Sequence, residues 1–143
     1  MRVLVDTGAL LGLYHARDQH HVRAVQIAGI HKTSGGRYVG TTLILAEFHT
    51  LLLYLRGPGD ARNVVAKLLA DQRHEWIAVS AELARDATIN WLTRFSDQPF
   101  SLTDAVSFEV MRREKITHAF AFDHHFKVAG FELLRAGASE KGR

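Results

Sequence analysis

Short apolar segments alternate with helical segments along this chain, and no two apolar segments are joined by a hairpin turn. Five segments are short and mostly apolar, as expected of strands: residues 3–5, 38–40, 76–79, 116–122 and 131–134. Strands that are separated by helices pair in parallel, because a parallel connection needs a crossover of roughly a dozen residues. The pattern therefore predicts an α/β fold with a central parallel sheet of about five strands flanked by helices.

The predicted helices follow from apolar periodicity and from residues that favour helix ends. They cover the segment after Asp6, and then residues 19–30 behind Asp18, 43–55, 61–70, 81 to about 95, and 102 to about 115. Right-handed crossovers between the strands place all the strand carboxyl ends at one edge of the sheet. Open α/β sheets bind their ligands at that edge.

Size and composition indicate one domain with a substantial core, since the chain has 143 residues of which 47% are hydrophobic. We expect the domain to span 1–135, followed by a flexible C-terminal tail at 136–143, which is small and polar. No apolar run approaches the roughly 18 residues needed to cross a bilayer, and no signal peptide is recognisable. The expected location is therefore the cytoplasm, without a membrane partner.

The absence of cysteine excludes disulfides and thiolate metal sites, so any metal must be held by oxygen or imidazole. The formal net charge is +3 and the isoelectric point about 9.5. A basic chain of this kind suits a polyanionic substrate, although many proteins of similar charge bind no nucleic acid.

Four acidic residues stand at positions that the predicted fold brings to the same edge of the sheet. Asp6 and Asp123 directly follow strands, whereas Glu47 and Asp104 lie near the start of helices. Each also has a local explanation. Asp6 could cap the following helix, Glu47 could reach solvent at the margin of an apolar helix, and Asp104 could form a capping box with Ser101.

Taken together, the four acids predict a single pocket. Converging carboxylates repel one another, and a divalent cation relieves that repulsion. A donor set of carboxylates without thiolates favours Mg²⁺ or Mn²⁺ over Zn²⁺. Such an ion activates water and orients it toward a phosphodiester, so the predicted chemistry is phosphoryl transfer.

Four motifs in order resemble the PIN-domain ribonucleases, in particular the VapC-type toxins of toxin–antitoxin pairs. They are Val-Asp-Thr-Gly-Ala at 5–9, Leu-Ala-Glu-Phe at 45–48, Leu-Thr-Asp-Ala-Val-Ser-Phe at 102–108 and Ala-Phe-Asp-His-His-Phe at 121–126. The resemblance covers nearly the whole chain. It implies a three-layer PIN-like domain and an endoribonuclease that depends on Mg²⁺ or Mn²⁺.

The resemblance also assigns roles to residues. Asp6 and Asp104 would be the principal metal ligands, and Glu47 and Asp123 would complete the catalytic site directly or through water. Thr7 and Thr103, each beside a ligand, would orient water or carboxylate. The family further implies an RNA substrate, a homodimer and a cognate antitoxin whose peptide covers the acidic groove.

Several features of the sequence have more than one interpretation. Arg112 and Arg113 could contact RNA phosphates or merely complement the dipole at the end of their helix. The apolar excess of 43–55 could serve a partner or the core. His124 and His125 are not counted as ligands, because a histidine pair in a loop is usually solvated and Mg²⁺ disfavours imidazole, and His49 near Glu47 is left out likewise.

Two rival functions remain. An aspartyl-phosphate phosphatase expects a second acid two residues after the first, where this chain has Gly8. A PIN-like module that binds RNA or protein without cleavage would more often lack part of the acidic set.

Overall fold

The computed structural model describes residues 1–137 and contains one parallel five-stranded sheet, ordered β3-β2-β1-β4-β5. The strands are β1 (Arg2–Val5), β2 (Arg37–Thr41), β3 (His74–Ile77), β4 (His118–Phe120) and β5 (Glu132–Leu133). Every neighbouring pair is parallel. The predicted α/β class, the number of strands and their parallel pairing are confirmed. The part of the expected tail from residue 138 onward lies outside the described residues.

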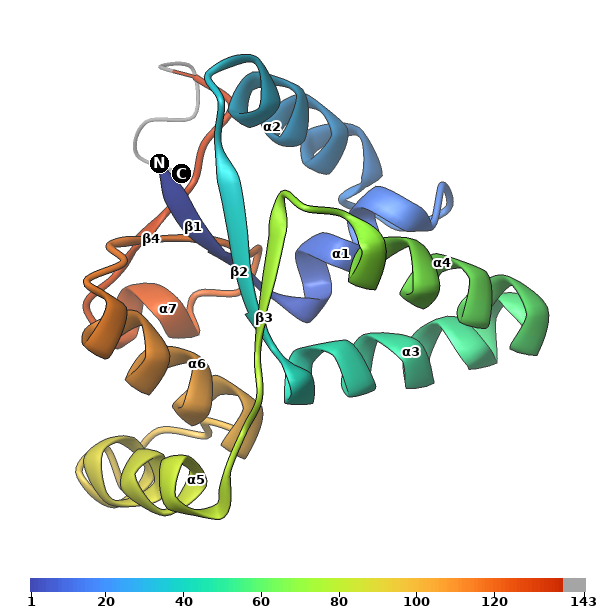
Figure 1. Ribbon diagram of the computed structural model, residues 1–143. Helices are drawn as coiled ribbons and strands as arrows, with labels where there is room; N and C mark the ends of the chain where they lie inside the picture. The colour runs from blue at the N-terminus through green and yellow to red at the C-terminus, as the bar shows by residue number, and fades with distance from the viewer. Residues whose placement is uncertain (138–143) are drawn as a thin grey trace.

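Helices cover both faces of this sheet and complete three layers (Figure 1). They are α1 (Thr7–Tyr14), α2 (His21–Thr33), α3 (Thr42–Arg56), α4 (Pro58–Ala70), α5 (Ala81–Ala87), the π-helix η1 (Thr88–Thr93), α6 (Leu102–Glu114) and the short α7 (His125–Val128). Helices α1, α3 and α4 lie on one side, and α5, α6 and α7 lie on the other (Figure 1). Among the described residues, no helix combines the length and apolar character needed to cross a bilayer.

Some element ends differ from the prediction for local reasons. Helix α4 begins at Pro58, because proline fits the first turn and Gly57 makes the preceding turn at φ 85°. His20, not Asp18, occupies the N-cap position of α2 and makes no capping hydrogen bond with its side chain, while the Asp18 carboxylate accepts the backbone N–H of His20 at 3.0 Å. Strand β4 is shorter than the predicted 116–122, and the predicted helix at 81–95 changes to π geometry at Thr88.

The core lies on both sides of β1, whose Val3, Leu4 and Val5 are fully buried. An aromatic cluster fixes α6 against α7. In it Phe108 packs edge-to-face on Phe126 at 5.1 Å between ring centroids and on Phe100 at 5.0 Å. This packing holds the first turns of α6 and α7 together, and those turns carry site residues.

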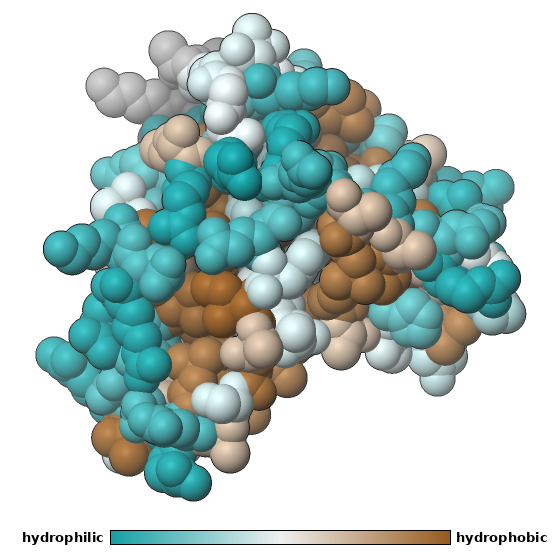
Figure 2. Space-filling view, in the orientation of Figure 1, coloured by the Kyte–Doolittle hydropathy of each residue, from teal (hydrophilic) through white to brown (hydrophobic). Residues whose placement is uncertain are grey.

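Helix α3 is apolar beyond the needs of one buried face. Only Ile44, Phe48 and Leu52 are buried, while Leu51, Leu53, Tyr54 and Leu55 are exposed. The space-filling view likewise shows apolar side chains between hydrophilic ones on the visible surface (Figure 2). The sequence left partner and core as alternatives for this helix, and in the structure part of its apolar surface is buried in the core while the rest is exposed.

Candidate metal centre

A hollow of about 490 Å³ receives all four predicted acids, and we call it the acidic pocket. Its lining residues are Asp6, Thr7, Gly8, His20, Glu47, Leu51, Pro99, Ser101, Asp104, Phe122, Asp123 and His125. They come from the first turns of α1, α6 and α7 with the loops before them, from the loop before α2 and from the interior of α3. Four segments that are distant in sequence therefore meet in one pocket, as the position of the acids at strand and helix ends predicted.

Asp6 is the most buried acid of the pocket, with 7% of its surface exposed. It occupies the N-cap position of α1, but its side chain makes no capping hydrogen bond. Its backbone N–H donates to the carbonyl of Phe120 at 3.0 Å, which fixes Asp6 beside the end of β4. Asp6 is therefore the N-cap residue by position, but its carboxylate lines the pocket and does not cap the helix.

The surroundings of Asp6 disfavour its ionised form. Burial is the main cause of a rise in its pKa from 3.8 to about 8. The negative charges of Asp123, Asp104 and Glu47 contribute to the rise, and a hydrogen bond from the backbone of Thr7 opposes it. Without a cation, Asp6 is a carboxyl group that holds its proton at neutral pH.

Asp104 serves its helix and the pocket at the same time. The Ser101 hydroxyl accepts the N–H of Asp104 at 3.0 Å, and Asp104 Oδ2 accepts the N–H of Ser101 at 3.1 Å, so the capping box is confirmed. The same Oδ2 lies 3.0 Å from His125 Nδ1. An ionised carboxylate only accepts hydrogen bonds, so Nδ1 carries the proton in this contact. Oδ1 takes part in none of these bonds.

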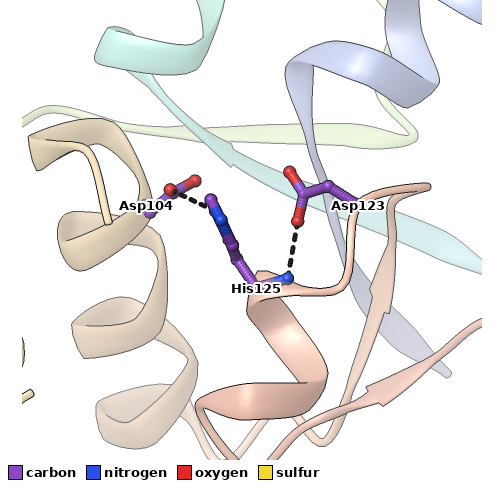
Figure 3. A group of neighbouring side chains, drawn as sticks. All are labelled: Asp104, Asp123 and His125. Atoms are coloured by element: carbon purple, nitrogen blue, oxygen red, sulfur yellow. Dashed lines mark hydrogen bonds and ion pairs between the residues drawn. The ribbon is translucent and has the colours of Figure 1, made fainter. Parts of the chain in front are cut away.

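His125 belongs to the pocket, which corrects the prediction that it is a solvated loop residue. Asp123 Oδ1 accepts its backbone N–H at 2.9 Å, so the loop turns back and directs the ring toward Asp104 (Figure 3). Ligand atoms of Asp104, Asp123 and His125 all lie within 4.8 Å of one another. An aspartate that caps the residue two positions later is a recognisable turn signal, and it could have indicated this geometry. His124 is exposed, and His49 does not line the pocket.

The remaining predicted residues have different positions. Glu47 is exposed, as its local alternative supposed, but it still lines the pocket and raises the pKa of Asp6. Thr7 is 4% exposed, and its Oγ1 has no hydrogen-bond partner within residues 1–137. Thr103 is half-buried and is not among the lining residues. Of the two threonines, the structure brings only Thr7 to the pocket.

The donor set fits a divalent cation. The pocket contains a buried carboxyl group with a raised pKa, three further acids and a buried hydroxyl without a partner in the described part of the chain. Each of these costs free energy without a cation, and a cation among them would offset these costs. Oxygen donors dominate the pocket, which suits hard ions, and His125 adds one imidazole. The group is thus an acidic Asp/His cluster of the kind that holds a metal.

Arg112 and Arg113 lie outside the acidic pocket and bind the fully buried Glu109. Arg112 Nη2 and Arg113 Nε approach Glu109 Oε2 at 2.6 and 2.8 Å, and Arg113 also pairs with Asp86 at 2.7 Å. Ion pairing with Glu109 is a third role for these arginines, besides RNA contact and the helix dipole that the sequence left open. Their contact with RNA stays a prediction.

The raised pKa of Asp6 leads to a prediction about the metal-free protein. The folded state holds a proton on Asp6 that the unfolded state has already released between about pH 4 and pH 8. Stability should therefore fall as pH rises through this range, at about 1.4 kcal/mol per unit of pKa difference at most. Thermal melts in chelator at pH 5 and 8 measure this loss, and millimolar Mg²⁺ or Mn²⁺ should restore much of it.

Asp6→Asn provides the matched control for these melts. An amide does not titrate, so the variant should melt at a higher temperature than the parent at pH 8 in chelator and respond less to pH. A parent protein whose melting temperature is constant from pH 5 to 8 and unaffected by either ion would contradict this description of the pocket.

Comparisons with known proteins agree with this geometry. The family model of the PIN domain matches residues 3–132. A VapC ribonuclease of Archaeoglobus fulgidus is 32% identical over 130 residues, which cover 90% of this chain and 81% of the relative. The 23S rRNA-specific endonuclease VapC20 of Mycobacterium tuberculosis is 44% identical over 134 residues, covering 93% of this chain and 98% of the relative.

Solved structures give the same result. The crystal structure of M. tuberculosis VapC20, described as a sarcin–ricin loop cleaving toxin, superimposes with a TM-score of 0.81 and 31% identity over 93% of this chain and 98% of that chain. VapBC2 of Rickettsia felis, solved with a fragment of its promoter DNA, has a TM-score of 0.70 at 13% identity and supports the fold alone; it covers 93% of this chain and 97% of that one. The chain belongs to the PIN-domain family and, within it, to the VapC ribonucleases.

Proposed function

We propose that this protein is an endoribonuclease that hydrolyses RNA phosphodiester bonds with Mg²⁺ or Mn²⁺ and acts as the toxin of a toxin–antitoxin pair. The observation that carries the proposal is the burial of Asp6 among three further acids in one pocket. Membership of the VapC ribonucleases supports it. A cytoplasmic location accords with an RNA substrate.

The chain's own residues would divide the work at the pocket. Asp6 and Asp104 would be the principal ligands of the ion, and Glu47 and Asp123 would complete its surroundings. A bound divalent cation supplies an activated water and stabilises charge on the phosphodiester. The ring N–H of His125 holds Asp104 Oδ2 in place, while Thr7 offers a buried hydroxyl that has no other partner in the described chain.

We further propose the sarcin–ricin loop of 23S rRNA as the substrate, because VapC20 is named for cleavage of that RNA and matches most of this chain. The test is incubation of the pure protein with 23S rRNA, 16S rRNA and tRNA, with Mg²⁺ or Mn²⁺ and with chelator, followed by primer extension. A single metal-dependent cut in the loop is expected. Cleavage elsewhere would redirect the substrate, and RNA binding without any cut would favour a non-catalytic PIN module.

Partners follow from the same family. We propose a homodimer whose interface includes the exposed apolar side chains of α3, and a cognate antitoxin whose peptide covers the acidic pocket. These side chains, Leu51, Leu53, Tyr54 and Leu55, are more apolar surface than a single helix normally leaves in water. Light scattering should report twice the 16.0 kDa chain mass for the parent, and the chain mass for Tyr54→Glu with Leu55→Glu.

The position of His125 leads to a prediction about metal affinity, for which the neighbouring His124 provides the control variant. Its ring positions Asp104, and His125→Ala removes this contact while keeping the backbone N–H that binds Asp123, so the variant should weaken Mn²⁺ binding by roughly 10–100-fold. Calorimetric titration of the metal-free protein measures this affinity. The exposed His124 makes neither contact, so His124→Ala should bind Mn²⁺ like the parent. Equal affinities for all three proteins would exclude His125 from the metal centre.

A further inference from the structure

A second hollow, of about 130 Å³, lies next to the acidic pocket and is lined by cations. Its residues are Arg23, Ala121, Phe122, Lys127, Leu133, Leu134 and Arg135, and we call it the basic hollow. The three cations come from α2, from α7 and from the segment after β5. The fold therefore collects positive charge from three distant parts of the sequence at one place.

Phe122 is the wall that the two hollows share, because it lines both of them. His20, which lines the acidic pocket, stacks on the Phe122 ring at 4.3 Å between centroids with an interplanar angle of 10°. Arg23, which lines the basic hollow, places its guanidinium carbon 5.6 Å from the centre of the same ring. Asp123 of the acidic pocket follows Phe122 directly in the sequence, so the shared wall adjoins one of the acids.

No acidic residue is among the described residues that line the basic hollow. Lys127 and Arg135 form no ion pair with any carboxylate of residues 1–137. A neighbouring hollow that shares Lys127 and Arg135 also contains Glu132, whose carboxylate lies 2.9 Å from His118 Nε2. The basic hollow is thus the more favourable place for an anion.

We propose that the basic hollow binds a phosphate of the RNA backbone next to the phosphodiester held at the acidic pocket, an inference that rests on the proposed ribonuclease function. The acids repel an approaching polyanion, and cations at the shared wall would offset this repulsion on one side of the cleavage point. The hollow is smaller than the roughly 300–1,000 Å³ of sites for drug-sized ligands. It therefore suits one phosphate group and not a whole nucleotide.

The test compares two pairs of charge removals in the full-length chain. Lys127→Ala with Arg135→Ala removes two cations from the basic hollow. Arg62→Ala with Lys67→Ala removes two exposed cations from α4, which line neither hollow. Binding of a fluorescein-labelled single-stranded RNA is followed by anisotropy in Mg²⁺ from 50 to 200 mM salt, with Asp104→Asn in every protein to prevent cleavage. Melting temperatures confirm that all variants fold.

Each phosphate contact of a single strand contributes about 0.7 to the slope of log affinity against log salt, so loss of the one phosphate held in the hollow lowers the slope by about 0.7. The parent should then lose about 2.6-fold more affinity over this range than the hollow variant does. The α4 variant should keep the parent's slope. Equal slopes for hollow variant and parent, or equal reductions in both variants, would overturn the proposal.

Cleavage assays with proteins that keep Asp104 test this inference separately from the ribonuclease function on which it rests. The hollow variant should show a raised KM and an unchanged kcat, because its substitutions lie outside the acidic pocket. If the hollow variant cleaves RNA with the parent's KM and binds it with the parent's salt slope, the proposed role of the basic hollow is wrong and the ribonuclease function still stands. A parent protein that neither binds nor cuts RNA would overturn both.

RNAs in which a single phosphate is made neutral identify the phosphate that the basic hollow binds. Once the cut is mapped, single methylphosphonates are placed one at a time at the phosphates flanking it. One of them should weaken binding to the parent and have no further effect on the hollow variant. If no neutralised position distinguishes the two proteins, the cations do not hold a backbone phosphate.

Discussion

Asp104→Asn and Asp6→Asn should each lower the rate of RNA cleavage by about 10²–10³-fold or more while leaving the fold intact. An asparagine keeps the shape of aspartate but not the charge that holds a cation. Asp104→Asn can keep its capping bond to Ser101 through the amide oxygen, so α6 should still begin at the same residue. Initial rates with RNA in Mg²⁺, together with circular dichroism, measure the two effects.

The two variants should differ in stability, which separates a lost ligand from a damaged fold. In chelator at pH 8, Asp6→Asn should be more stable than the parent, because it removes a buried carboxyl group whose pKa is raised to about 8. Asp60→Asn removes an exposed charge that pairs with Arg56 and should change neither rate nor stability appreciably. Parental cleavage rates in both site variants would refute the mechanism.

Glu109→Gln should destabilise the protein by roughly 3 kcal/mol, because the side chain is fully buried and its carboxylate joins two helical segments. Oε1 accepts the Trp91 ring N–H and the Asn90 amide from η1, both at 3.1 Å. Oε2 binds the two arginines of α6. An amide nitrogen in place of Oε2 cannot accept those bonds, so both arginines would lose their charged partner, and the bonds to η1 would be left with a neutral acceptor.

The pH dependence of stability tests the same group. Burial alone would raise the pKa of Glu109, but hydrogen bonds from Arg112, Arg113, Asn90 and Trp91 outweigh it and lower the pKa from 4.5 to about 2. The stabilisation is therefore complete above about pH 4.5 and is lost as pH falls toward 2. Urea unfolding of parent and variant at pH 7 and pH 3 measures both effects.

Glu82→Gln on the exposed first turn of α5 is the matched control and should unfold like the parent. The difference between Glu109→Gln and the parent should narrow at pH 3. Identical unfolding curves for the two proteins at pH 7 would contradict the assignment of Glu109 as the link between η1 and α6.

The alternation of strands and helices was sufficient to predict the fold class, because strand pairing in this architecture follows from the length of the connections. The order of the strands was not predictable in the same way. β1 lies between β2 and β4, and this arrangement depends on which helices pack together across each face. Element ends such as the start of α4 at Pro58 depended on local turn geometry.

The sequence by itself determined the parallel sheet, the four acids at its edge and the family, since these depend on residue order and on the end of each element. Only the tertiary structure decided where side chains point. In the structure His125 contacts Asp104, Glu47 is exposed at the pocket, and Thr103 is not among the lining residues. Arg112 and Arg113 bind Glu109. Periodicity reports which face of an element is buried, whereas these contacts join residues of different turns and elements whose relative placement is set by packing.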